Sequence, residues 1–138
     1  MKIVLPPDYQ PSEEEEFMNP LQVEFFRQQL IDWRDQLIDE SELTLSALQS
    51  DSLAQPDWTD RASIETDRAL ELRTRDRARK LIVKINDALN RVEDGSYGFC
   101  EETAKPIGLR RLMARPIATL SIEAQERHER MERSHRDD

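Results

Sequence analysis

Apolar residues recur every three or four positions over two long stretches of the chain, and this spacing predicts two amphipathic helices. In the first stretch the apolar positions are Val23, Phe26, Leu30, Trp33 and Leu37. They follow Asn19-Pro20, and asparagine before a proline at the first helical position is a good start signal. The first helix is therefore predicted to run from Asn19 to about Ala54.

The second stretch has its clearest apolar stripe at Leu81, Ile85, Ala88 and Val92. Asp94-Gly95 follows it, and glycine readily takes the left-handed conformation that closes a helix. The second helix is predicted from about Arg61 to Asp94. Because the connection is short, the two helices should pack antiparallel. Each arm has about 33 residues, so the hairpin should be roughly 50 Å long.

Two aspartates lie in the short connection, residues 55–62. Pro56 disfavours helical geometry at Gln55. Asp57 and Asp60 can each cap the helix that follows. The pair is thus expected at the exposed tip of the hairpin, where helix capping is the plain interpretation. A narrow arm that ends in carboxylates can reach into a cleft of another molecule, but it cannot enclose a substrate of its own.

The two ends of the chain differ from the hairpin, which covers residues 19–94. Residues 1–18 are predicted to be an irregular arm that packs on a globular part. Residues 95–120 are predicted to form a small finger with two short extended pieces, at Tyr97–Cys100 and Pro106–Leu109. Residues 121–138 follow as a C-terminal helix, capped by Ser121 and regular to about Ser134. The predicted fold class is mainly α.

Composition agrees with a hairpin that has a narrow apolar seam. Charged residues make up 36% of the chain and aromatic residues 6%, which suits a solvated helical pair better than a thick core. The net charge of −9 opposes independent binding to DNA phosphates. No apolar run approaches the roughly 20 residues that span a bilayer, and no signal pattern is present at the N-terminus. We expect a soluble, cytoplasmic protein.

Three blocks of the sequence resemble the DksA/TraR family of bacterial RNA polymerase regulators. They read DWTDRA at 57–62, ELRTRDRARKLI at 71–82, and VEDGSYGFCE at 92–101, the last continuing as IGLRRLMARP at 107–116. The third block is long and distinctive. The order of hairpin, finger and C-terminal helix also fits the family along nearly the whole chain.

The resemblance implies a regulator that binds RNA polymerase directly, as a monomer, without binding DNA and without enzymatic activity. Its coiled-coil tip would enter the secondary channel and approach the catalytic subunits' active-site region. Asp57 and Asp60 would be the effector residues there, with Ala62 supporting the tip contact. Transcription initiation would then change together with the effector guanosine tetraphosphate, as in the stringent response.

The resemblance also implies roles for the basic second helix. Arg77 and Lys80 would dock on the polymerase, although helix solubility explains such charges equally well. Positions that match the family's guanosine tetraphosphate site at the polymerase interface are Leu81, Lys84 and Arg115. Gln125 stands where the family's site has a basic residue, so a weaker alarmone response is expected.

One departure from the family concerns its structural zinc. The family pattern is CxxC, a spacer and CxxC, but these positions read Cys100, Thr103, Ser121 and Ala124. A closed zinc site needs four N, S or O ligands, so the finger is predicted to be metal-free, with no cofactor, and held by apolar packing. Cys100 is expected to be a packed relic. Its neighbours Glu101 and Glu102 are expected to raise its pKa.

Those apolar residues are Tyr97, Phe99, Ile107, Leu109, Leu112, Met113, Ile117, Leu120 and Ile122. His128 and His135 are predicted to be solvated residues of the last helix rather than substitute ligands.

Other functions stay open at the level of sequence. A coiled-coil adaptor without a transcriptional role would carry the same hairpin. A transcript-cleavage factor would also use acidic tip residues, although the third block argues against it. A hydrolase built on Asp57 and Asp60 is disfavoured, because no histidine or further carboxylate cluster lies near them and nothing there excludes water.

Overall fold

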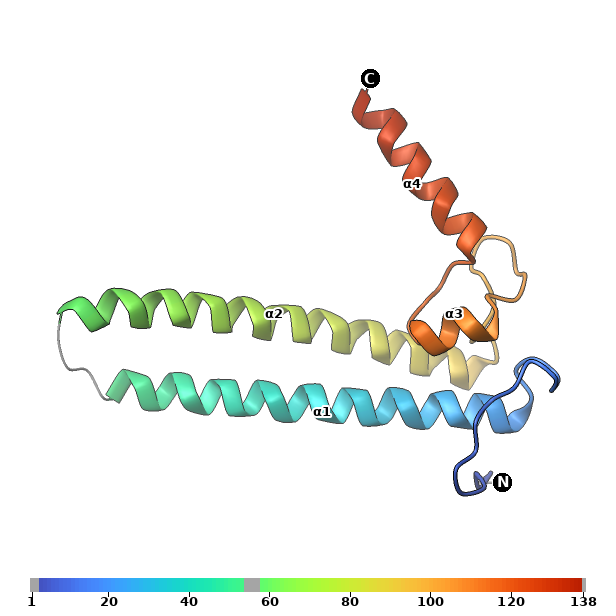
Figure 1. Cartoon of the computed structure of the whole chain (residues 1–138), viewed down its shortest axis with the longest axis horizontal. Coiled ribbons are helices and arrows are strands. Elements are labelled where there is room, and N and C mark those ends of the chain that lie inside the picture. The colour runs from blue at the N-terminus through green and yellow to red at the C-terminus, as the bar shows by residue number, and fades with distance from the viewer. Residues whose placement is uncertain (1–2, 54–57, 138) are drawn as a thin grey trace. The chain divides into compact units, whose positions relative to one another are not determined.

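The computed structural model describes residues 3–53 and 58–137, with side chains described for 3–43 and 63–135. The fold is mainly α, as predicted (Figure 1). The chain forms two compact units, a globular unit of residues 1–30 and 87–138 and a hairpin unit of residues 31–86. The helices are α1 (Pro20–Leu53), α2 (Trp58–Asp94), α3 (Leu109–Ala114) and α4 (Ile122–Asp137).

The hairpin unit consists of the long parts of α1 and α2, which lie side by side and antiparallel (Figure 1). Arg34 Nη1 donates a hydrogen bond to Asn86 Oδ1 at 2.8 Å, which joins the two helices across 52 positions of sequence. The apolar seam is thin. Ile85 is fully buried, whereas Leu37 and Leu81 are only half-buried. This agrees with the narrow seam expected from composition.

The helix signals in the sequence operate as predicted at two ends. Asn19 Oδ1 accepts hydrogen bonds from the backbone N–H groups of Leu21, at 2.9 Å, and Gln22, at 3.1 Å, and so caps α1. Gly95 closes α2 with a φ of 84°. The start of α2 was predicted too late. Because α2 begins at Trp58, Asp60 lies within its first turn.

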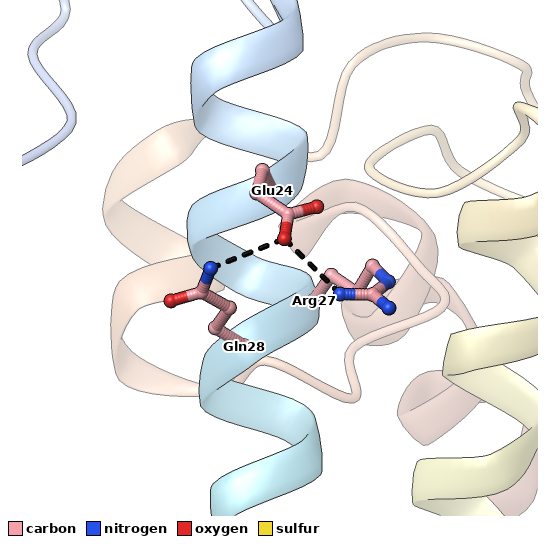
Figure 2. A network of polar contacts seen from close by, with 3 residues as sticks. All are labelled: Glu24, Arg27 and Gln28. Carbon is pink, nitrogen blue, oxygen red and sulfur yellow. Dashed lines mark hydrogen bonds and ion pairs between the residues drawn. The ribbon is translucent and has the colours of Figure 1, made fainter. Parts of the chain in front are cut away.

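The first turns of α1 also carry a polar network on their surface (Figure 2). Glu24 Oε1 accepts from Arg27 Nη1 at 3.1 Å and from Gln28 Nε2 at 3.1 Å. Side chains three and four positions apart meet on a helix surface, and each such pair contributes about 0.2–0.5 kcal/mol. This network therefore supports the helix locally.

The core of the globular unit joins α1 to the finger through aromatic rings. Phe26 is completely buried, and its ring centroid lies 5.4 Å from that of Phe25 and 5.8 Å from that of Tyr97. Burial strongly disfavours ionisation and raises the pKa of Tyr97. The other buried apolar residues of this unit are Leu30, Ala88, Cys100, Ile107, Leu109, Leu112, Ile117, Ala118 and Ala124.

Two residues predicted to help hold the finger are instead exposed. Met113 is 40% exposed and Ile122 is 51% exposed. The reason lies in two short helical turns. In α3 the buried positions are Leu109 and Leu112, so Met113 points away, and at the start of α4 the buried position is Ala124.

The finger contains a helix that the sequence did not indicate. The two predicted extended pieces meet only in an isolated bridge between Phe99 and Pro106. Leu109, expected at the end of the second piece, instead begins α3, directly after Gly108 with its φ of 106°. The cap of α4 is as predicted, since Ser121 Oγ accepts from the backbone N–H of Ala124 at 3.2 Å. No helix in the described part of the chain has the length and apolarity to cross a membrane.

Candidate functional site

A basic face runs along α2 within the hairpin unit. Arg77, Leu81 and Lys84 lie four and three positions apart, so they share one side of the helix. Arg77 and Lys84 are exposed, and Leu81 is half-buried. Neither cation has an ion-pair partner among the described residues. This face therefore offers two free positive charges beside an apolar side chain.

The neighbouring charges on α2 are paired with each other. Asp76 accepts from Arg79 Nη2 at 2.8 Å and lies 3.4 Å from Lys80 Nζ. Both cations are more than 70% exposed, and such surface pairs contribute about 0–1 kcal/mol. Lys80 can thus exchange Asp76 for another partner at little cost.

Arg115 and Gln125 lie in the globular unit. Arg115 is exposed directly after α3, and its backbone N–H donates to the carbonyl of Arg111 at 2.7 Å. Arg111 Nε in turn donates to the carbonyl of Leu120 at 2.9 Å, which fastens the segment before α4. Gln125 Nε2 donates a hydrogen bond to Glu129 Oε1 at 3.3 Å. The position at which the resemblance implies a basic residue thus holds a neutral amide.

The tip residues are only partly placed. Asp60 and Ala62 lie in the first turns of α2, but their side chains are outside the described set. Asp57 lies outside the described residues altogether. The backbones of Asp60 and Ala62 thus lie at the start of α2, next to the connection between the two long helices.

The four positions that match the zinc ligands of the family come together in the globular unit; we call Cys100, Thr103, Ser121 and Ala124 the knuckle positions. Three of them are buried, and Thr103 is half-buried. The Cys100 sulfur accepts hydrogen bonds from the Thr103 hydroxyl and from three backbone N–H groups, those of Glu102, Thr103 and Ser121. Hydrogen bonds to one sulfur therefore connect three of the four knuckle positions.

The expectation that the pKa of Cys100 is raised was wrong. Burial by itself would raise the pKa, but the hydrogen bonds from Thr103, Ser121 and Glu102 lower it to about 6 from an ordinary value of 9.0. The acidic neighbours act elsewhere, because Glu101 lies 3.9 Å from Arg91 and Glu102 contacts His128. His128 was predicted to be a solvated residue of the last helix. It is exposed, but its contact with Glu102 also joins α4 to the finger.

This shift predicts a pH-dependent stability of the globular unit. Since the pKa of Cys100 is depressed to about 6 by folding, ionisation stabilises the fold, fully above pH 9.0 and progressively less as pH falls to about 6. Thiolate ultraviolet absorbance of the folded protein should titrate near 6, and that of urea-unfolded protein near 9.0. A Cys100→Ala control should lose the signal. Equal midpoints in the two states would contradict the hydrogen-bonded sulfur.

The residues at the knuckle do not fit a zinc ion. One thiol, two hydroxyls and a methyl group cannot supply the four ligands of a closed site. Among the described residues no group of three or more His, Cys, Asp or Glu side chains could hold a metal. The pairing of His128 with Glu102 also occupies the histidine nearest to the finger in sequence.

We therefore expect a metal chelator to leave the unfolding midpoint of the protein unchanged, and metal analysis to find no stoichiometric zinc. A variant with the three missing cysteines restored, T103C/S121C/A124C, is the matched control and should gain both zinc and chelator sensitivity. Stoichiometric zinc in the unmodified protein, or its unfolding by chelator, would show that ligands other than the knuckle positions hold a metal.

Comparison with protein families shows to which family the chain belongs. Residues 22–92 match the model of the DnaK suppressor protein DksA N-terminal domain, and residues 95–130 match the prokaryotic dksA/traR C4-type zinc finger. The chain belongs to the DksA/TraR family. Within this family the chain departs at the zinc finger itself, where one of the four cysteines remains.

Similar proteins of the DksA/TraR family cover most of the chain. An RNA polymerase-binding transcription factor DksA of Caulobacter vibrioides is 65% identical over 131 residues, covering 95% of this chain and 92% of the relative. The protein of the same name in Escherichia coli K12 is 48% identical over 115 residues, covering 83% and 76%. The solved structure of transcription factor DksA2 from Pseudomonas aeruginosa matches with a TM-score of 0.79 at 44% identity, covering 90% and 94%.

Proposed function

We propose that this protein binds RNA polymerase and regulates transcription initiation by inserting its hairpin tip into the secondary channel. The observation that carries the proposal is the near-complete coverage by a 65% identical relative named as an RNA polymerase-binding transcription factor. The hairpin unit supports it, because a two-helix arm with a thin seam is narrow enough to enter a channel. The net charge of −9 opposes independent binding to DNA phosphates, which agrees with a protein partner.

The tip acts in this proposal through charge and without covalent chemistry, so the protein is not an enzyme. Asp57 and Asp60 bring negative charge toward the catalytic subunits, and Ala62 supports their contact. A ligand shifts an equilibrium only by binding one conformation better than another. The carboxylates thus favour one state of the polymerase. The protein works as a monomer in the cytoplasm, where the polymerase is.

Arg77 and Lys80 are the proposed docking residues. Both are exposed on α2, and Lys80 has only the exposed partner Asp76 to exchange. Guanosine tetraphosphate binds in this proposal where the chain meets polymerase. The proposed contributors are Leu81, Lys84 and Arg115, since guanidinium and ammonium groups suit phosphate oxygens. The amide of Gln125 weakens the response.

For Lys84→Ala we expect the alarmone-dependent part of the transcriptional effect to fall by about tenfold, the worth of one hydrogen bond to a charged group. The alarmone-independent part should persist. Arg79→Ala is the matched control, because Arg79 is exposed but paired with Asp76 on another side of α2. Transcription from a ribosomal RNA promoter with alarmone titrated provides the measurement. A normal alarmone response of Lys84→Ala would remove this residue from the site.

The direct test of the proposal is binding to core polymerase followed by transcription in vitro. Purified protein should bind core polymerase, and a photo-crosslinker at Trp58 should label the catalytic subunits. Failure to bind core polymerase would leave the coiled-coil adaptor as the remaining function. Cleavage of the transcript in backtracked complexes would instead assign the hairpin to a cleavage factor.

A further inference from the structure

The knuckle positions of this protein cannot bind a zinc ion, so another interaction must hold the finger together. In a C4-type finger four thiolates on one ion tie two chain segments together. Here the two segments, which begin at Cys100 and Ser121, are joined at the knuckle positions by a hydrogen bond from the Ser121 N–H to the one sulfur. The loss of metal ligands therefore raises the question of what else in the chain holds the finger.

The N-terminal residues 3–19, which we call the strap, end against the finger. The ring of Phe17 meets the ring of Phe99 edge to face, with centroids 5.6 Å apart and planes at 86°. Met18 lies on Gly98, where a Cβ atom would stand only 2.8 Å from the Met18 Cγ and Sδ atoms. No space for a side chain is left between strap and finger. The contact falls one and two residues before Cys100.

The strap is fastened to the first turn of α1 by one buried amide. Gln22 is 1% exposed. Its Nε2 donates to the Ser12 carbonyl at 3.2 Å, and its Oε1 accepts from the Met18 N–H at 2.9 Å. A buried amide with both ends bonded fixes the groups around it. Gln22 thus holds two points of the strap six residues apart.

The outer part of the strap is also ordered by specific contacts. The Tyr9 ring packs edge to face on Phe25, with centroids 6.1 Å apart. The Tyr9 hydroxyl donates to Glu15 at 3.0 Å, and the Ser12 N–H donates to the same carboxylate at 2.9 Å. Desolvation and the nearby Glu15 charge raise the pKa of Tyr9. The strap is therefore a folded element rather than a tail.

We propose that the strap replaces the zinc ion as the restraint that keeps the finger closed. The strap packs against Gly98 and Phe99, and the neighbouring Cys100 sulfur accepts hydrogen bonds within the finger. Both act on the segment that leads into the first knuckle position. Release of the strap should open the finger, which a metal would otherwise prevent.

The single thiol of the chain provides a direct test in the full-length protein. Cys100 is 3% exposed, so a thiol reagent labels it only when the finger opens. Phe17→Ala and Gln22→Ala should each raise the labelling rate by about tenfold or more, because each removes an anchor of the strap. Val4→Ala is the control, since Val4 is 83% exposed in the same strap. Unchanged labelling in both anchor variants would overturn the proposal.

A second experiment asks whether metal and strap are interchangeable. Hydrogen exchange of residues 98–112 is compared for Phe17→Ala in the natural chain and in zinc-loaded T103C/S121C/A124C. The exchange rate should rise by about tenfold in the natural chain and little in the zinc-loaded one. An equal rise in both would show that the strap does not stand in for the metal. If the restored variant takes up no zinc, the Cys100 labelling rates decide alone.

Discussion

Asp60→Asn should abolish the effect of this protein on transcription while leaving its binding to polymerase nearly unchanged. The substitution removes one negative charge and keeps the side-chain size. At saturating protein we expect the change in initiation to fall by about tenfold or more, because the carboxylate supplies the differential interaction between polymerase states. Titrated binding to core polymerase and transcription from a ribosomal RNA promoter measure the two effects separately.

The fold should tolerate this change. Asp60 lies in the first turn of α2, where an acidic side chain interacts with the helix dipole by only about 0.3–1 kcal/mol. Asp67→Asn is the matched control, since it removes the same charge from an exposed position two turns further along α2. A loss of binding in Asp60→Asn would make the tip a docking contact. A full transcriptional effect would leave Asp60 with its interaction with the helix dipole alone.

The long helices were predictable because their signals are local. The Asn19 cap and the Gly95 stop act on their own neighbours, and the apolar stripe repeats over several turns. The helix α3 was not, because six residues are too few to show a 3.6-residue period. The start of α2 was also missed by three residues, which changes the place of Asp60 from before the helix to inside it.

The electrostatics of the knuckle could not be inferred from neighbours in sequence. Glu101 and Glu102 adjoin Cys100, but in the fold their carboxylates meet Arg91 and His128. Backbone N–H groups, which every sequence possesses, point at the sulfur instead. The sign of the pKa shift therefore depends on chain geometry and not on residue type.

The packing of the strap likewise could not be inferred from neighbours in sequence. Gln22 lies between apolar Leu21 and Val23, and its polar side chain is of a type usually found on the surface. In the fold, however, it is only 1% exposed. Its two hydrogen bonds reach Met18 and Ser12, four and ten positions away. Such a residue is identified only when its partners are placed, since a buried amide is stable only when they are present.

Gly98→Ala should destabilise the globular unit by roughly 2–5 kcal/mol. A left-handed backbone costs a residue with a Cβ atom about 1–2 kcal/mol, and overpacking adds about 1–3 kcal/mol. Gly98 has a φ of 93°, and its added Cβ would stand 2.8 Å from Met18 Cγ. Because Met18 belongs to the strap, the change also pushes the strap from the finger. Urea unfolding followed by circular dichroism gives the free-energy difference.

Gly95→Ala is the control that separates backbone strain from lost packing. Gly95 has a φ of 84°, but nothing lies within 4 Å of its Cβ position, so its substitution should cost only about 1–2 kcal/mol. Met18→Ala makes room beside residue 98, and combined with Gly98→Ala it should recover part of the larger penalty as a measurable coupling. Equal costs at the two glycines, without coupling to Met18, would mean that the strap does not press on the finger.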